Sequence, residues 1–233
     1  MPSARRSAAT NDPLNQPAYG LAEAARYLKL PSATLRAWTF GRQYPTTQGE
    51  GRFHPLIRPA SKEPPLLSFS NLIEAHVLRA LRTDHGVSVK EVRAAVRFAE
   101  HTLNIDRLLL RQELRADAGR IFLDRYGELI NLSASGQLAM RQVLDAHLKR
   151  VTWNGEFPNR LYPFVMADAP DAHMPIAIDP TISFGRPVVA RRGISTAAIV
   201  GRIDAGESVA DIAADYELGQ EDIEHAVLYE RAA

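Results

Sequence analysis

The sequence predicts a mainly α-helical protein with small β elements, arranged in three parts. Three observations predict this fold class. Apolar residues recur with helical spacing, glycine and proline gather between the helical segments, and 233 residues suffice for more than one core. We expect structured parts over residues 16–84, 85–170 and 171–233, after a disordered tail at residues 1–15.

Composition narrows the class of protein. A hydrophobic fraction of 45% and a charged fraction of 24% are typical of folded globular chains. The absence of cysteine excludes disulfides, thiol catalysis and cysteine-ligated metal centres. No stretch approaches the roughly 18 apolar residues of a membrane helix, and no apolar run follows the first arginines as in a signal peptide. We therefore expect a cytoplasmic protein without a membrane partner.

The first part begins with two short helices. The apolar stripe of the first consists of Leu21, Ala24, Ala25 and Leu28. Ser32 is expected to cap the second, whose inner side carries Leu35 and Trp38. A three-residue turn between them indicates a helix-turn-helix. Residues 41–65 are rich in glycine and proline, which forbid a helix and permit a loop or hairpin, and this segment is typical of a wing.

Positive charge and hydroxyl groups gather on this winged helix-turn-helix. Residues 1–60 carry 8 Lys and Arg against 3 Asp and Glu. Short hydroxyls reach phosphates and arginine can read guanine, so the predicted DNA-facing residues of the second helix are Ser32, Thr34, Arg36 and Thr39. The predicted phosphate contacts of the wing are Arg42, Arg52 and Arg58. The alternative is a helical pair with a charged surface loop.

The middle part is an α+β region to which the sequence assigns no role. A core helix from Phe69 to Leu81 leads into it, and a capping box at Ser88 opens the next helix. Residues 121–132 read as a hairpin around Tyr126-Gly127. A further helix runs from Ser135 to Leu148, followed by extended pieces and a proline-containing linker.

The last part reads as short strands followed by a three-helix module, and it is acidic. Residues 171–233 carry 11 Asp and Glu against 5 Lys and Arg. Its last helix carries four carboxylates that would repel DNA phosphates, namely Glu221, Asp222, Glu224 and Glu230. This surface suits a basic partner or self-association, and the alternative is a solubilising face. Arg186, Arg191 and Arg192 are expected to meet a partner's carboxylates, with an ordinary surface role as the alternative.

Signatures of catalysis are missing from the sequence. There is no phosphate-binding G-x-x-x-x-G-K-[ST] loop, no G-x-S-x-G elbow and no H-E-x-x-H pair. His76 lies on an apolar helical face, where a packed or hydrogen-bonded histidine is expected rather than a metal ligand. We expect a protein that is not an enzyme and that uses neither a cofactor nor a metal ion.

Two stretches of sequence resemble known families. Residues 19–28 and 32–38 resemble the winged helix-turn-helix of MerR-like regulators, although the wing is longer and cysteines are absent. Residues 178–188, 193–196 and 206–216 are similar to a small domain of unknown function found in VapB-like antitoxins. As a whole, the chain resembles a large VapB-type antitoxin of the mycobacterial kind, from a type II toxin-antitoxin system.

This resemblance implies partners that composition does not reveal. It implies a VapC-like PIN-domain ribonuclease toxin, which the protein would neutralise, and operator DNA, through which it would repress its own operon, acting as a homodimer. The alternative is a stand-alone MerR-like transcription regulator, whose middle region would sense a small effector.

Overall fold

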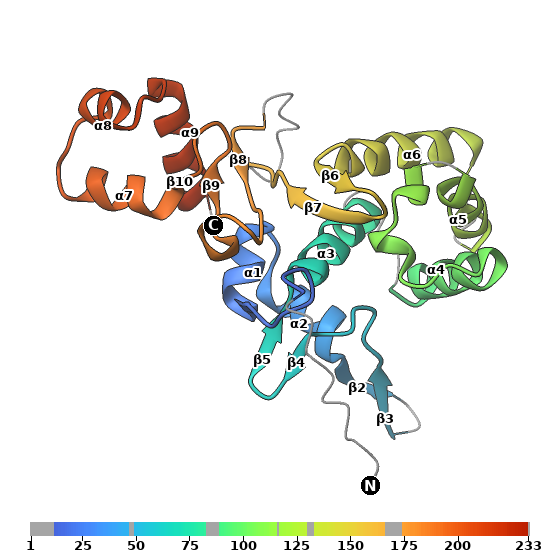
Figure 1. Ribbon diagram of the computed structural model, residues 1–233. Coiled ribbons are helices and arrows are strands. Elements are labelled where there is room, and N and C mark those ends of the chain that lie inside the picture. The colour runs from blue at the N-terminus through green and yellow to red at the C-terminus, as the bar shows by residue number, and fades with distance from the viewer. Residues whose placement is uncertain are drawn as a thin grey trace, which may run out of the picture.

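The structure, a computed structural model, describes residues 12–46, 49–82, 89–115, 117–129, 133–165 and 174–232. Its fold is mainly α-helical with small antiparallel sheets, which confirms the predicted class (Figure 1). The α-helices are α1 (Leu21–Tyr27), α2 (Ser32–Phe40), α3 (Phe69–Arg82), α4 (Val89–Leu103), α5 (Asp117–Leu129), α6 (Ala134–Leu148), α7 (Thr196–Asp204), α8 (Val209–Tyr216) and α9 (Gln220–Arg231). Short 3-10 turns are η1 (Leu108–Leu110), η2 (Gln112–Arg115) and η3 (Ser183–Gly185). No helix in the described ranges is long and apolar enough to span a membrane.

The strands form small sheets that link the helical layers. One sheet has the order β1-β5-β4 and consists of β1 (Tyr19–Gly20), β5 (Pro65–Leu67) and β4 (Ser61–Lys62). Two hairpins pair β2 (Arg42–Thr46) with β3 (Gly49–Phe53), and β6 (Val151–Asn154) with β7 (Phe157–Leu161). A last sheet has the order β10-β9-β8 and consists of β10 (Ile194–Ser195), β9 (Val188–Val189) and β8 (Ile176–Ala177).

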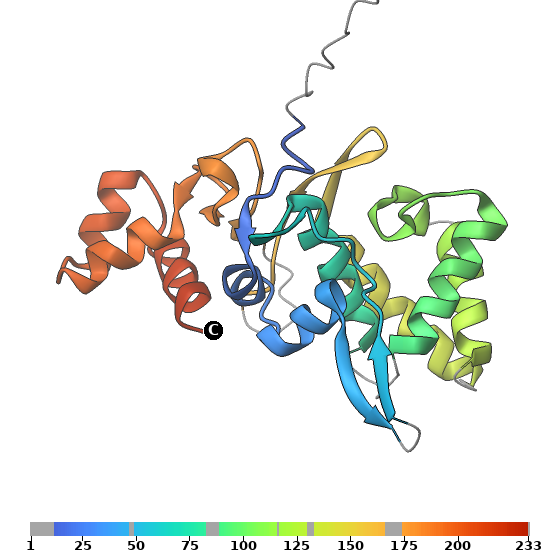
Figure 2. The same cartoon turned by 90° about the horizontal axis from the view of Figure 1, so that it is seen from below.

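The first helices stand between two helical groups. In both views, α1, α2 and α3 occupy the middle, α4 to α6 lie on one side, and α7 to α9 lie on the other (Figures 1 and 2). The β2–β3 hairpin projects away from the body beside α2 (Figure 2). One continuous apolar core runs from Tyr19 to Ile178, and a second holds the C-terminal helices. The wing is therefore the part that reaches out from a packed centre.

Helix α3 is the central element, buried from Phe69 to Leu81. Its polar side chains are satisfied by other segments, as buried polar groups must be. The Asn71 side-chain amide donates to the Arg58 carbonyl at 2.9 Å, and its oxygen accepts from the Ala60 N–H at 3.0 Å. His76 Nε2 lies 3.0 Å from the His147 carbonyl, which confirms the expectation of a buried, hydrogen-bonded histidine.

The prediction of a hairpin over residues 121–132 is wrong. Residues 121–129 belong to α5, and residues 130–132 lie outside the described part. Phe122 and Tyr126 are both buried and stack with ring centroids 5.7 Å apart, a pair one helical turn apart. Gly127 lets the Gln137 side chain of α6 pack closely against α5. A Cβ at position 127 would lie only 2.6 Å from Gln137 Nε2. Tertiary packing thus overrode a local turn signal.

Several domain boundaries predicted from the sequence lie outside the residues that the structure describes. The boundaries at residues 84/85 and 170/171 lie within the ranges 83–88 and 166–173, as does the capping box at Ser88. Residues 1–11 of the expected tail also lie outside the described part. Residues 12–15 are structured, contrary to the prediction, because the Ser70 N–H donates to the Leu14 carbonyl at 2.9 Å and Leu14 packs on the core.

Candidate nucleic-acid interface

The turn between α1 and α2 sets the geometry of the helix pair. Lys29 adopts the left-handed conformation (φ 52°), and the Leu30 N–H donates to the Ala25 carbonyl at 2.9 Å, which ends α1 as in a Schellman motif. Pro31 then occupies the N-cap position of α2. The prediction that Ser32 caps this helix is therefore wrong by one residue, because proline with its fixed φ already stands at the cap.

The outward side of α2 carries part of the predicted DNA-facing set. Ser32 and Arg36 are exposed, and Thr34 is half-buried. Thr39 is only 1% exposed, so its placement on the outward side is wrong. It follows Leu35 by one turn and shares its inner face, where the Thr39 hydroxyl donates to the Leu35 carbonyl at 2.8 Å.

The wing is fastened to the end of α2 by backbone contacts. Gly41 has φ 80°, and a Cβ there would lie 2.4 Å from the Phe53 carbonyl oxygen, so glycine is required where the first wing strand begins. The N–H groups of Leu56 and Ile57 donate to the Trp38 carbonyl at 2.7 and 3.0 Å. Trp38 is 1% exposed, which confirms it as a core anchor. Helix and wing therefore form one unit.

The wing arginines occupy different places. Arg42 is exposed on the strand that continues directly from α2, so it joins Ser32 and Arg36 on one continuous segment. Arg58 is exposed beyond the wing and borders a cleft beside α4. Arg52 lies opposite Gln43 in the hairpin, but its side chain is outside the described part. Glu50 is the sole acidic residue from Ser32 to Lys62, so this segment favours anions.

Two arginines of α4 were missed by the sequence reasoning. Arg93 donates to the His54 carbonyl, and its guanidinium lies 5.0 Å from the Phe53 ring centroid, so it supports the base of the wing. Arg97 follows one turn later. The signal that could have revealed them is the pair of arginines at i and i+4, which follow the buried Val92 and Val96 by one residue each.

The C-terminal helices contact the helix-turn-helix through one side of α9. The Tyr229 hydroxyl donates to the Tyr27 carbonyl at 3.0 Å, and Glu230 forms an ion pair with Arg26. Lys29 Nζ lies 4.2 Å from the centre of the Tyr229 ring, and burial lowers the pKa of Lys29 to about 8. This side of α9 is therefore occupied within the chain.

The other side of α9 is exposed. Glu221 and Glu224 are exposed and have no ion-pair partner among the described residues, and Leu228 beside them is 48% exposed. Asp222 instead accepts the Gly219 N–H at 3.0 Å and so helps to begin its own helix. An open hollow of about 340 Å³ adjoins this stripe and is lined by Ile203, Val209, Glu224, Val227 and Leu228.

The three arginines predicted to meet a partner do not form one cluster. Arg186 forms an ion pair with Glu23 of α1, and Arg192 forms one with Glu217 at 2.6 Å. Arg191 is exposed. Carboxylates of the same chain thus engage two of the three, and a role for any of them in binding a partner stays a prediction. Within the described ranges, no three His, Asp or Glu side chains are grouped so as to hold a metal ion.

Two segments of the chain match known families. Residues 17–96 match a family described as "Putative DNA-binding HTH domain", which extends from β1 to the first half of α4 and includes the helix pair and the wing. Residues 176–229 match a family described as "Protein of unknown function (DUF433)", which covers the C-terminal sheet and helices. The first match agrees with the helix-turn-helix seen in α1 and α2, so the N-terminal region holds a helix-turn-helix domain.

Similarity to known proteins extends over nearly the whole chain. A Mycobacterium tuberculosis protein named "Putative antitoxin VapB45" is 27% identical, over 91% of this chain and 92% of that protein. "Uncharacterized protein Rv2308" of the same organism is 26% identical, over 93% and 91%. The crystal structure of Rv2018 from Mycobacterium tuberculosis superposes with a TM-score of 0.65 at 23% identity, over 91% of this chain and 97% of that one. This last likeness shows a shared fold.

Proposed function

We propose that this protein is the DNA-binding antitoxin of a type II toxin-antitoxin system and acts by binding rather than by catalysis. In this role it neutralises a VapC-like, PIN-domain ribonuclease toxin and represses the operon that encodes both proteins. The similarity to a protein named as an antitoxin supports the assignment, because it extends over both the helix-turn-helix and the C-terminal helices.

The DNA-binding half rests on one observation above all: α2 and the wing expose cations on a continuous segment. Arg36 projects from α2 and Arg42 from the strand that follows, and Arg36 has no ion-pair partner among the described residues. In MerR-like proteins, to which residues 19–38 are similar, the second helix enters the major groove and the wing follows the backbone. A homodimer on a palindromic operator fits this mode of binding, since two half-sites mirror two-fold symmetry.

The toxin-binding half is assigned to the exposed side of α9. Glu221 and Glu224 offer uncompensated negative charge, and Leu228 offers apolar area beside them. A ribonuclease must attract RNA phosphates, so its surface carries the positive charge that these carboxylates complement. The opposite side of α9 is fixed to α1, which leaves this stripe for a partner.

Co-expression with the product of the neighbouring small reading frame tests the assignment directly. Growth with and without this protein measures neutralisation, a pull-down measures the complex, and a mobility shift with the shared promoter measures DNA binding. We expect restored growth, a stable complex and a shifted promoter. A neighbour that neither binds nor harms growth would contradict the antitoxin role.

A specific observation favours one second candidate, a stand-alone MerR-like regulator with an effector-sensing middle region. A cleft of about 530 Å³ lies between the segment after the wing and α4, at the junction through which an effector could alter the wing. Promoter binding without any toxic neighbour is the outcome expected of this regulator.

A further inference from the structure

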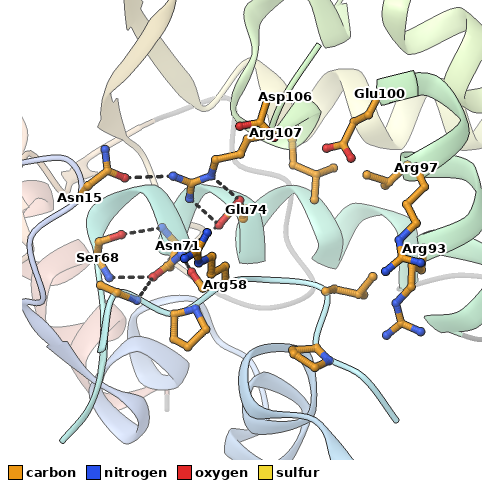
Figure 3. A pocket seen from close by; sticks show the side chains of 16 residues that line it. Asn15, Arg58, Ser68, Asn71, Glu74, Arg93, Arg97, Glu100, Asp106 and Arg107 are labelled. Carbon is orange, nitrogen blue, oxygen red and sulfur yellow. Dashed lines mark hydrogen bonds and ion pairs between the residues drawn. The ribbon is translucent and has the colours of Figure 1, made fainter. Parts of the chain in front are cut away.

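The cleft at the base of the wing is built from four separate segments. Its walls are Asn15, the stretch Pro55–Ala60 after the wing, the start of α3, and α4 with the turn that leads to η1 (Figure 3). The volume of about 530 Å³ is in the range of small-molecule sites. The cleft therefore lies where the wing meets the middle region.

Three arginines on the walls of this cleft form no ion pair with the described residues. Arg93 and Arg97 of α4 lie together in Figure 3, and Arg58 lies beside Asn71 across from them. None of these three arginines forms an ion pair within the described ranges. Arg107, by contrast, is neutralised by Glu74 through two hydrogen bonds of 3.0 and 3.1 Å.

Arg93 and Arg97 are arranged unfavourably unless an anion is present. Burial and the neighbouring Arg97 lower the pKa of Arg93. The buried Nε of Arg93 has no hydrogen-bond partner in the described part of the chain. Like charges one turn apart on a helix repel each other, and an unpaired buried donor costs free energy. An anion between the arginines would relieve both penalties.

The acidic residues of the cleft restrict where an anion can lie. Glu100 accepts the Leu108 N–H at 3.0 Å, and burial raises its pKa. Asp106 lies near it, beside Arg107 (Figure 3). These carboxylates disfavour an anion beside Glu100 and Asp106 and direct it toward Arg93 and Arg58, with Arg97 between Arg93 and Glu100 on α4.

We propose that the cleft between the wing and α4 binds a phosphate group, held by Arg58, Arg93 and Arg97. Guanidinium groups match phosphate oxygens with paired donors, which makes arginine the favoured residue for this ligand. The phosphate comes either from the DNA backbone beside the wing or from a small phosphorylated compound. The DNA source rests on the proposed function, whereas the small-compound source does not.

The test uses the full chain with Arg97→Gln, Arg97→Lys and the control Arg141→Gln. Arg97 is exposed and lacks an ion pair among the described residues, so its replacement leaves the fold intact. Arg141 is an exposed arginine of α6 outside the cleft, and its replacement changes net charge equally. Calorimetry with inorganic pyrophosphate measures the small-anion source. Affinity for promoter DNA is measured at salt concentrations from about 50 to about 200 mM and tests the DNA source. Each phosphate contact releases roughly one counterion, so its loss changes the salt dependence of the affinity.

The outcomes separate the two sources. If DNA supplies the phosphate, Arg97→Gln lowers the slope of log affinity against log salt by about 0.9 and the wild type does not saturate with pyrophosphate. If a small compound supplies it, the wild type saturates with pyrophosphate and Arg97→Gln weakens that binding by roughly tenfold or more, with Arg97→Lys in between. The proposal is overturned if Arg97→Gln and Arg141→Gln show the same salt dependence of DNA affinity and the same affinity for pyrophosphate. Failure of the wild-type protein to bind promoter DNA would contradict the proposed function. Calorimetry with pyrophosphate would still test whether the cleft binds a phosphate group.

Discussion

Arg36→Ala tests the division of labour between the two ends of the chain. Arg36 is exposed on α2 and has no ion-pair partner among the described residues, so its removal changes the free energy of unfolding by no more than about 0.5 kcal/mol. A base-reading arginine contributes about 1–3 kcal/mol to binding. We therefore expect affinity for the promoter to fall by between about fivefold and 150-fold. Toxin binding, assigned to α9, should not change.

Fluorescence anisotropy with labelled promoter DNA measures the first affinity, and calorimetry with the purified toxin measures the second. Thermal melting checks that the variant is folded, and Arg141→Ala, which removes an exposed arginine from α6, controls for the loss of one charge. Unchanged promoter affinity would refute the assignment of α2 as the reading helix. Equal losses in DNA and toxin binding would refute the separation of the two surfaces.

Three further predictions concern the interior and the acidic surface. Thr39→Val removes the hydroxyl that donates to the Leu35 carbonyl, so the free energy of unfolding should fall by about 1 kcal/mol while promoter affinity stays within twofold. Burial lowers the pKa of His76 well below 6.5. Below about pH 6.5, His76 therefore binds a proton in the unfolded chain but stays neutral in the native state. Stability should therefore fall from pH 7 to pH 5 in chemical denaturation, with a shallower fall in His76→Gln. Reversing both charges with Glu221→Lys and Glu224→Lys should slow association with the toxin, most strongly at low salt, in stopped-flow mixing.

Each of these predictions has a contrary result. A large loss of promoter affinity in Thr39→Val would mean that the hydroxyl faces DNA after all. Identical pH dependence in wild type and His76→Gln would mean that another group dominates acid destabilisation. For the acidic stripe, the matched control is Glu113→Lys with Asp124→Lys, two exposed carboxylates of η2 and α5. If this control slows association with the toxin equally, the change in net charge causes the slowing and the position of the carboxylates on α9 does not matter.

Local patterns alone predicted the elements whose signals are self-contained. The periodicity of α1 and α2 and the proline and glycine of the wing specify structure within a few residues. The same patterns failed at α5, because Tyr126-Gly127 reads as a turn unless the neighbouring helix is known. A short apolar run does not by itself distinguish a strand from a helix.

The sequence by itself determined the fold class, the helix pair with its wing, and the contrast between a basic beginning and an acidic end. These features depend on composition and on neighbours within about one helical turn. Only the tertiary structure decided that Arg186 pairs with Glu23 and that Arg58 and Arg97 border one cleft. Such pairings join residues far apart in the chain. They depend on how side chains fill shared space, and no local pattern of residues records that packing.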